Sequence, residues 1–199
     1  RSKNELIDEE SFANNAAGDF RDSQIATIYE LYQHELHKNN AFDFDDLIMQ
    51  TVRLLAENDD IAKKYGKKFK YISVDEYQDT NHAQYVLTKL LTDKYKNLCV
   101  VGDDDQSIYS WRGADINNIL DFEKDYPNCT TVKLEQNYRS TPKILKRAWN
   151  VVQNNEGRVA KQLWTENEDN GVINVFQNMN ENDEAHRTVD MILINKANN

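Results

Sequence analysis

Hydrophobic residues in the first third of the chain recur every three or four positions. In residues 21–38 the apolar positions are Ile25, Ile28, Tyr29, Tyr32 and Leu36. In residues 43–56 the same spacing is kept by Phe44, Leu47, Ile48, Thr51 and Leu55. A repeat of this kind places apolar side chains along one face of a helix. We therefore predict two amphipathic helices in this part of the chain.

The period changes after residue 70. Short runs rich in β-branched and apolar residues, each bounded by polar residues, follow at 71–76, 97–105, 130–137 and 171–177. Such runs are typical of buried strands. Helical spacing lies between them at 83–91, 116–120 and 144–152, and the polar stretch 153–170 is predicted to be a surface excursion. Strands that alternate with helices predict an α/β fold with a parallel sheet.

The charge of the chain limits how it could contact nucleic acid. It has 24 Lys and Arg residues and 34 Asp and Glu residues, so the net charge is −10. This charge repels a polyanion at long range, which argues against a general nucleic-acid coat and confines any DNA contact to a local site. The one dense basic stretch, residues 61–70, is predicted to be a solvated helix end and loop, with a phosphate contact as the alternative.

The sequence indicates a cytoplasmic protein without a membrane partner. No run approaches the roughly 18 apolar residues of a membrane span, and the first residues lack the apolar core of a signal peptide. Two cysteines, Cys99 and Cys129, are too few for a disulfide framework. Because the chain begins without Met and ends soon after an apolar helical pattern, we expect it to be a piece of a larger protein.

Two adjacent acids end the first predicted strand. Asp75 and Glu76 follow the apolar run Ile-Ser-Val. In an open α/β sheet, ligands bind beyond the carboxyl ends of the strands. Asp75 could there hold the Mg²⁺ that bridges phosphates, and Glu76 could orient and deprotonate an attacking water. A solvated Asp-Glu turn is the alternative.

A second strand also breaks into acids, at GDDDQSIYSWRGA (102–114). Tyr109, Trp111 and Arg112 alternate in this polar segment. Two aromatic faces and a guanidinium suit stacking against unpaired bases. The alternative is that both aromatic residues are core anchors. Gln106, just past the acids, could reach a γ-phosphate or its attacking water. A nucleotide would then be connected to the aromatic loop.

The third motif is LEQNYRSTP (134–142), where a predicted strand leads into a helix. Arg139 lies at this junction. A guanidinium placed there can stabilise charge on a transferring phosphoryl group. An exposed ion pair is the alternative.

Taken in order, FDFDDLI (42–48), VDEYQDTN (74–81), GDDDQSIYSWRGA (102–114) and LEQNYRST (134–141) resemble the successive motifs of the UvrD/PcrA/Rep group of superfamily 1 DNA helicases. The resemblance implies a partial RecA-like domain of the P-loop NTPase class over residues 57–133. It also implies a portion of a helical subdomain at 1–56 and the beginning of a second RecA-like domain at 134–199.

The resemblance also implies roles for single residues. For ATP these are Mg²⁺ binding by Asp75, water activation by Glu76, γ-phosphate sensing by Gln106 and a γ-phosphate contact by Arg139 from the second domain. For DNA they are stacking of single strands on Tyr109 and Trp111, with Arg112 linking the DNA and ATP sites. The implied activity is ATP-driven 3′ to 5′ movement on single-stranded DNA with unwinding of partly duplex DNA, in repair or replication.

One motif of that family is absent from the sequence. A phosphate-binding loop reads G-x-x-x-x-G-K-[ST], whereas Gly66-Lys67 is followed by Lys68 and position 61 is Ile. We therefore predict that the chain alone hydrolyses ATP negligibly, although its parent is an ATPase. The alternative is a non-catalytic single-stranded DNA-binding or regulatory module derived from a helicase. A helicase–nuclease subunit is a weaker alternative, because no nuclease motif is present.

Overall fold

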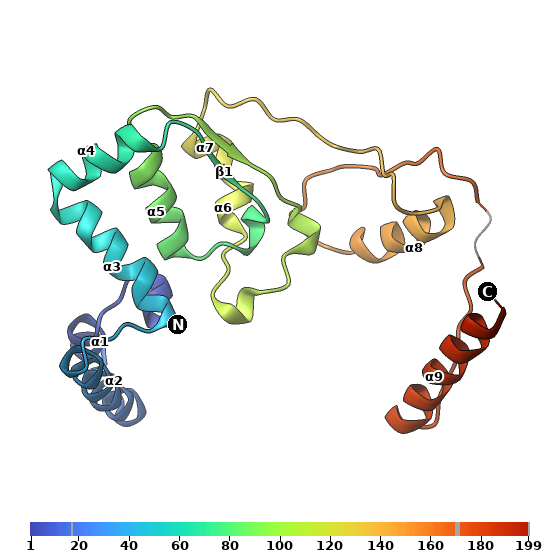
Figure 1. Ribbon diagram of the computed structural model, residues 1–199, viewed down its shortest axis with the longest axis horizontal. Helices are drawn as coiled ribbons and strands as arrows, with labels where there is room; N and C mark the ends of the chain where they lie inside the picture. Colours follow the sequence, from blue (N-terminus) through green and yellow to red (C-terminus); the bar gives the residue numbers. More distant parts are fainter. Residues whose placement is uncertain (17, 170–171, 199) are drawn as a thin grey trace. The chain divides into compact units, whose positions relative to one another are not determined.

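A computed structural model describes residues 1–16, 18–169 and 172–198 (Figure 1). The chain forms two compact units. Unit 1 comprises Arg1–Val132 together with Glu156–Ala160, and unit 2 comprises Lys133–Asn155 together with Lys161–Asn199. The three-part division at residues 56/57 and 133/134 stays a prediction.

Unit 1 begins with a layer of helices. A 3-10 helix η1 (Ser2–Glu5) precedes α1 (Glu9–Asn15), α2 (Phe20–Lys38), α3 (Phe44–Glu57) and α4 (Asp59–Lys68). Aspartates at positions 8, 19 and 43 start α1, α2 and α3, each accepting a hydrogen bond from a backbone N–H of the first turn. These caps satisfy donors that have no partner inside the helix. Both predicted helices are present, but their predicted apolar faces are largely exposed, as at Ile28 of α2 and at Phe44 and Leu47 of α3.

The basic stretch 61–70 is more helical than predicted. It continues α4 as far as Lys68, and α4 carries acids in its first turn and lysines in its last. This charge order favours a helix, because acidic side chains stabilise its amino end and basic ones its carboxyl end. Stacking of Tyr65 on Phe69, with ring centroids 6.2 Å apart, extends the packing past the last turn.

The sheet of unit 1 is parallel, as predicted, and short. β1 (Ile72–Val74) pairs with β2 (Leu98–Val100), with Ser73 opposite Cys99. Both strands are shorter than the predicted runs 71–76 and 97–105. They are joined by the 3-10 helix η2 (Tyr77–Asp79) and by α5 (His82–Thr92), the helical crossover that parallel strands require. The α/β prediction is confirmed at this level, and its RecA-like detail stays a prediction.

The core of unit 1 lies between α3 and the segment from η2 to α5. Met49, Val52 and Leu55 of α3 are buried, as are Tyr77 of η2 and Ala83 of α5. Helix α3 packs against α5, α4 and η1. Burial of these side chains removes apolar area from water, which is the main favourable contribution to folding.

A buried ion cluster attaches η1 to the start of α3. The Lys3 side chain is almost fully buried, and its Nζ lies 2.6 Å from Asp43 Oδ2 and 2.9 Å from Asp46 Oδ1. Asp46 is itself only 1% exposed. A buried charge is tolerated when it is paired in this way. The N-terminal turn is therefore an integral part of unit 1.

Four short helices complete unit 1: η3 (Asp104–Gln106), η4 (Ser110–Arg112), α6 (Asn117–Leu120) and α7 (Phe122–Asp125). Helix α6 contacts η2, and Phe122 packs edge-on against Tyr77 with ring centroids 5.8 Å apart. These contacts place the loops that follow β2 next to the segment that follows β1. The predicted helix at 116–120 corresponds to α6.

Unit 2 contains α8 (Pro142–Val152) and α9 (Glu181–Asn198), and two predictions fail there. In the described residues neither 130–137 nor 172–177 forms a strand; Gly171 lies outside the described residues. Only an isolated parallel bridge joins Gln136 to Trp164. A run becomes a strand only when a neighbour supplies ladder hydrogen bonds along its length. In the described part of the chain the first run has such bonds only around Gln136, where Asn137 N donates to Trp164 O and Trp164 N donates to Glu135 O, and the second run forms no bridge.

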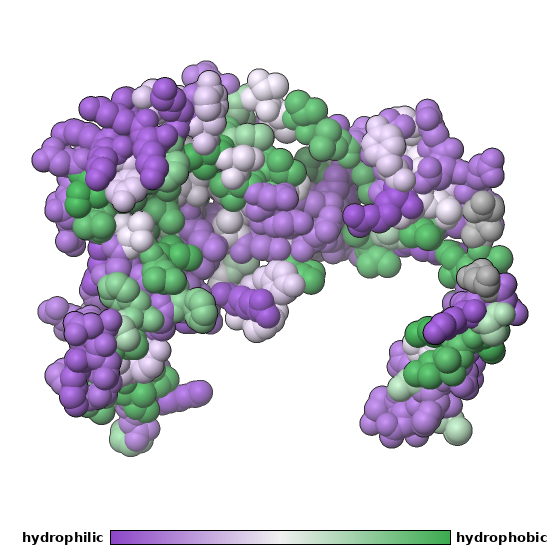
Figure 2. All heavy atoms as spheres, viewed as in Figure 1, coloured by the Kyte–Doolittle hydropathy of each residue, from purple (hydrophilic) through white to green (hydrophobic). Residues whose placement is uncertain are grey.

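Unit 2 leaves its apolar residues exposed. Val172, Val175 and Met179 are each more than four-fifths exposed. Figure 2 shows hydrophobic residues along the visible side of α9, and none of the described α9 residues is buried. Across the described residues, no helix has both the length and the apolar character needed to cross a membrane.

Candidate functional site

The acids predicted from the sequence lie at the carboxyl ends of β1 and β2. Hydrogen bonding between the two chain segments continues past the strands, since Val101 N donates to Val74 O at 2.8 Å and Tyr77 N donates to Val101 O at 3.0 Å. The residues that follow β1 are therefore held beside those that follow β2. This is the edge where open α/β sheets bind ligands.

Asp75 and Glu76 are both exposed at this edge. Glu76 adopts the left-handed conformation (φ 50°, ψ 44°), which is uncommon for a residue other than glycine and is often seen at functional sites. Its backbone N–H donates to Asp75 Oδ1 at 2.9 Å, and its carboxylate accepts a hydrogen bond from Gln78 Nε2 at 2.8 Å. The two adjacent carboxylates thus have different partners, a backbone N–H for Asp75 and the Gln78 side chain for Glu76, which is compatible with different roles.

Gln78 joins the two strand ends. Its side chain is only 1% exposed, and its Oε1 accepts a hydrogen bond from the backbone N–H of Asp103 at 3.0 Å. Gly102 lies against this amide: a Cβ there would be 2.5 Å from Gln78 Oε1 and 2.8 Å from Ile119 Cδ1. The glycine is needed because a side chain would occupy the place of the buried amide.

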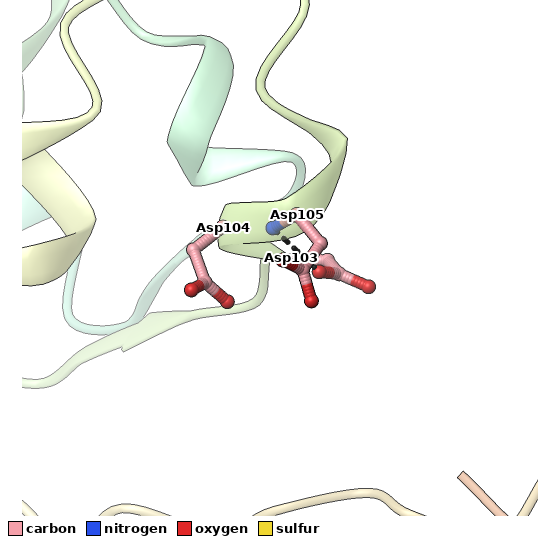
Figure 3. Close-up of side chains that lie close together, drawn as sticks. All are labelled: Asp103, Asp104 and Asp105. Atoms are coloured by element: carbon pink, nitrogen blue, oxygen red, sulfur yellow. Dashed lines mark hydrogen bonds between the residues drawn. The ribbon is translucent and has the colours of Figure 1, made fainter. Parts of the chain in front are cut away.

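Three aspartates form a tight turn after β2, in which one carboxylate oxygen of each lies within 4.8 Å of the others (Figure 3). Asp103 accepts from Asp105 N at 3.0 Å and from Gln106 Nε2 at 2.9 Å. Arg158 donates to both Asp105 oxygens, at 2.9 and 2.5 Å. These bonds raise the pKa of the Arg158 guanidinium. The acids are thus occupied by partners from the chain itself.

A cation bound at this edge fits Asp75 better than the aspartate turn. Mg²⁺ takes oxygen ligands, usually keeps several waters, and is bound through one or two carboxylates together with substrate phosphates. Asp75 is exposed and follows β1 directly. In the turn, by contrast, Asp105 is held by a guanidinium and Asp104 Oδ2 accepts from Val159 N at 2.7 Å.

The loop beyond the turn presents the predicted aromatic residues to solvent. Trp111 is 72% exposed and Tyr109 is 37% exposed, so the interpretation of both as core anchors is wrong. Their ring centroids lie 6.4 Å apart, and the Arg112 guanidinium carbon lies 5.0 Å from the Tyr109 ring and 4.5 Å from the Trp111 ring. Two ring faces and a cation are therefore gathered on one loop.

Backbone and side-chain hydrogen bonds attach this loop to the segment that follows β1. Asp115 N donates to Thr80 O at 3.0 Å, and Asn118 Nδ2 donates to the same oxygen at 3.0 Å. Gly113 closes the turn at φ 92°, a conformation that favours glycine. The exposed rings are thus carried on a loop whose carboxyl end is hydrogen-bonded to Thr80, in the segment that follows β1.

Arg139 lies in unit 2, just before α8. The side chain of Asn137 accepts hydrogen bonds from the backbone N–H groups of Arg139 and Ser140, at 3.0 and 2.7 Å. Arg139 is exposed, and within the described residues its guanidinium forms no ion pair. The alternative of an exposed ion pair thus gains no support in the described part of the chain.

Comparison with known proteins matches the sequence to one family. Residues 1–127 match the family model of the UvrD/REP helicase N-terminal domain, and residues 132–199 match that of the UvrD-like helicase C-terminal domain. The chain belongs to the UvrD/REP helicase family. The resemblance seen in the motif order is thereby confirmed.

Two curated members of the UvrD/REP family share about half of their residues with the chain over the aligned region. The ATP-dependent DNA helicase PcrA of Staphylococcus aureus is 53% identical over 186 residues, which is 94% of the chain. PcrA of Staphylococcus epidermidis is 53% identical over 191 residues, which is 96% of the chain. In both cases the chain spans 26% of the relative's length.

Two site residues were missed by sequence reasoning. Gln78 lies within the UvrD/REP motif VDEYQDTN, but nothing in the spacing shows that its amide is buried between the two strand ends. Arg158 lies in the polar stretch predicted to be a surface excursion, where a single Arg is no signal. Both act through contacts that are distant in sequence, 25 residues for Gln78 to Asp103 and 53 for Arg158 to Asp105.

Proposed function

We propose that the chain is part of an ATP-dependent 3′ to 5′ DNA helicase that couples Mg-ATP hydrolysis to movement on single-stranded DNA. One observation carries the proposal: the exposed Glu76 after β1 is hydrogen-bonded, through Gln78, to the turn that leads into the exposed aromatic loop. Its curated relatives, of which the chain spans 26%, are named ATP-dependent DNA helicases.

Each candidate residue has a role that suits its place. Asp75 would hold Mg²⁺, which when bound neutralises charge on the transferring phosphate. Glu76 would orient the attacking water and accept its proton. Gln106 would contact the γ-phosphate, and Arg139 would stabilise charge on it from the second unit.

The aromatic loop is proposed to bind unpaired bases. Stacking of a base on Tyr109 or Trp111 contributes roughly 1–3 kcal/mol and tolerates any sequence. Arg112, which lies over both rings, would add positive charge in a chain whose net charge is −10. Single-stranded DNA, or the unpaired part of a partly duplex DNA, is the substrate that this loop fits.

The ATPase proposal can be tested in a chimera of PcrA from Staphylococcus epidermidis in which this chain replaces the segment it aligns with. We expect DNA-stimulated ATP hydrolysis in the chimera, and a loss of about 10²- to 10⁴-fold in kcat for Glu76→Gln. Glu57→Gln, at the exposed end of α3, is the matched control and should hydrolyse ATP at the parent rate. An active Glu76→Gln chimera would contradict the proposed role.

A non-catalytic DNA-binding or regulatory module is the second candidate. The exposed rings of Tyr109 and Trp111, which could bind a single strand without any nucleotide, favour it. Both candidates predict negligible ATP turnover by the chain alone, so the chimera separates them. A chimera that binds single-stranded DNA without hydrolysing ATP would favour the module.

A further inference from the structure

The buried amide of Gln78 has both of its hydrogen-bonding ends occupied by the two strand ends. Nε2 donates to Glu76 Oε2 at 2.8 Å, and Oε1 accepts from Asp103 N at 3.0 Å. With 1% of its surface exposed, Gln78 has no solvent to replace either partner. A buried polar group that loses a partner is destabilised by its full desolvation penalty, so the two contacts are maintained together.

The chain of hydrogen bonds continues beyond Asp103. The Asp103 carboxylate accepts from Gln106 Nε2 at 2.9 Å. An unbroken path therefore runs from the Glu76 carboxylate, through the Gln78 amide and Asp103, to the side chain of Gln106. Tyr109 follows three residues later. The first two bonds share the Gln78 amide and so strengthen one another, and the third is joined to them through the covalent frame of Asp103.

Packing prevents the Gln78 amide from moving aside. Gly102 offers no Cβ, so its backbone contacts the amide directly, and Ser107 Oγ donates to the backbone oxygen of Gln78 at 3.4 Å. The residue itself lies in η2, where Tyr77 is also buried. The enclosed amide therefore cannot follow a displaced Glu76 without disturbing its bond to Asp103 N.

We propose that Gln78 is a positioning residue that fixes the Glu76 carboxylate to the Asp103–Gln106 turn, so that the two move as one body. The inference rests on the proposed function, because it gives Glu76 and Gln106 their nucleotide roles. A shift at the water-activating acid is then transmitted to the turn that precedes the aromatic loop, and the reverse also holds.

The test is amide hydrogen exchange at Asp103, measured by NMR on the ¹⁵N-labelled chain without nucleotide or DNA. Gln78→Leu removes the acceptor of the Asp103 N–H, and we expect its exchange to become about fivefold faster. Glu76→Ala leaves that acceptor in place but frees the amide, and we expect a smaller acceleration of about twofold. The double variant should exchange like Gln78→Leu alone, because the path is already cut.

Gln84→Leu is the matched control. Gln84 is an amide of the same unit whose Oε1 accepts from Asn81 N at 2.9 Å, and it contacts neither acid. It should leave Asp103 exchange unchanged. If Gln78→Leu fails to fold, Glu76→Ala alone tests the proposal. Faster exchange at both the Asp103 N–H and the Gln78 side-chain amide supports the positioning role of Gln78. Unchanged exchange at Asp103 overturns it.

Effects of Glu76→Ala and Gln78→Leu that multiply in the double variant would also overturn the proposal. Its failure is distinguishable from failure of the proposed function. If Glu76→Ala leaves Asp103 exchange unchanged while Glu76→Gln abolishes ATP hydrolysis in the chimera, only the positioning role of Gln78 is contradicted. If coupling is present while Glu76→Gln remains active, the contact is real and the proposed catalytic role falls.

Discussion

The two units of the chain use similar hydrophobic patterns in different ways. In unit 1 the pattern of α3 becomes a core, with Met49, Val52 and Leu55 at 2–5% exposure. In unit 2 the apolar runs remain open, and Val175 is 91% exposed. Every buried apolar side chain among the described residues belongs to unit 1.

The difference shows that a hydrophobic pattern favours a helix or a strand in a segment, and that a packing or pairing partner decides whether the segment forms it and is buried. Helix α3 finds α5, α4 and η1 within the chain. Among the described residues, the run predicted as a strand at 130–137 pairs only through the single bridge of Gln136 to Trp164, and the run predicted at 171–177 forms no bridge, so neither becomes a strand. The stability of the chain should therefore depend on unit 1.

The largest expected difference between the units concerns their ion pairs. Lys3→Met removes the partner of a carboxylate that is 1% exposed, Asp46, and should lower the free energy of unfolding by about 3–5 kcal/mol. Lys143→Met removes a half-exposed ion pair with Asp169 in unit 2 and should change the free energy of unfolding by about 0–1 kcal/mol. Urea unfolding followed by circular dichroism compares them, and equal midpoints would contradict the contrast.

Two methionines give the same comparison for apolar burial. Met49 is 2% exposed in unit 1, and Met179 is 91% exposed in unit 2. Met49→Ala leaves a cavity and should lower the free energy of unfolding by about 2–5 kcal/mol. Met179→Ala should change it by no more than about 0.5 kcal/mol. Thermal unfolding of both variants beside the parent chain measures this, and a destabilised Met179→Ala would show that unit 2 has a core.

Substitution of two glycines of unit 1 tests whether the strand ends are packed as tightly as the core. Gly102→Ala places a Cβ 2.5 Å from Gln78 Oε1 and should lower the free energy of unfolding by about 1–3 kcal/mol. Gly66→Ala, inside α4, meets nothing nearer than 3.7 Å and should raise it by about 0.5–1 kcal/mol. The opposite signs are the prediction, and urea midpoints measure them. A neutral Gly102→Ala would mean a loose site.

The smallest expected effect is the response of unit 1 to acid. Burial opposes ionisation of Asp43, but hydrogen bonds from Lys3 and the first turn of α3 outweigh it and hold its pKa below the ordinary 3.8. Hydrogen bonds from Ser11 likewise lower the pKa of Asp8. A lowered folded-state pKa contributes stability that is present above about pH 4 and is lost as the pH falls through the folded-state value.

The check is the melting temperature of the chain between pH 2 and 7, with Asp43→Asn as the comparison. The parent chain should lose melting temperature below about pH 4. The variant should start lower at neutral pH and lose less on acidification, because one of the two groups no longer titrates. Parallel curves for the two proteins would contradict this origin of the acid response.

Sequence reasoning reached the local features and missed the distant ones. The helices α2 and α3, the parallel strands and the exposed aromatic loop followed from period, strand-end acids and motif order. The lengths of the strands did not, since pairing in this chain covers three residues each. The Gln78 and Arg158 contacts could not be predicted either, because they depend on which loops the fold brings together.

The central claim, that this chain carries a DNA-binding aromatic loop, is tested most directly by fluorescence anisotropy with a short labelled single strand at two salt concentrations. The Tyr109→Ala/Trp111→Ala variant is compared with Phe20→Ala/Tyr71→Ala, whose rings are 80% and 82% exposed away from the loop. We predict that the loop variant binds at least about fivefold more weakly at both salts, as loss of base stacking requires, and that the control binds like the parent. Equal binding by the parent and the loop variant, both folded, would contradict the claim.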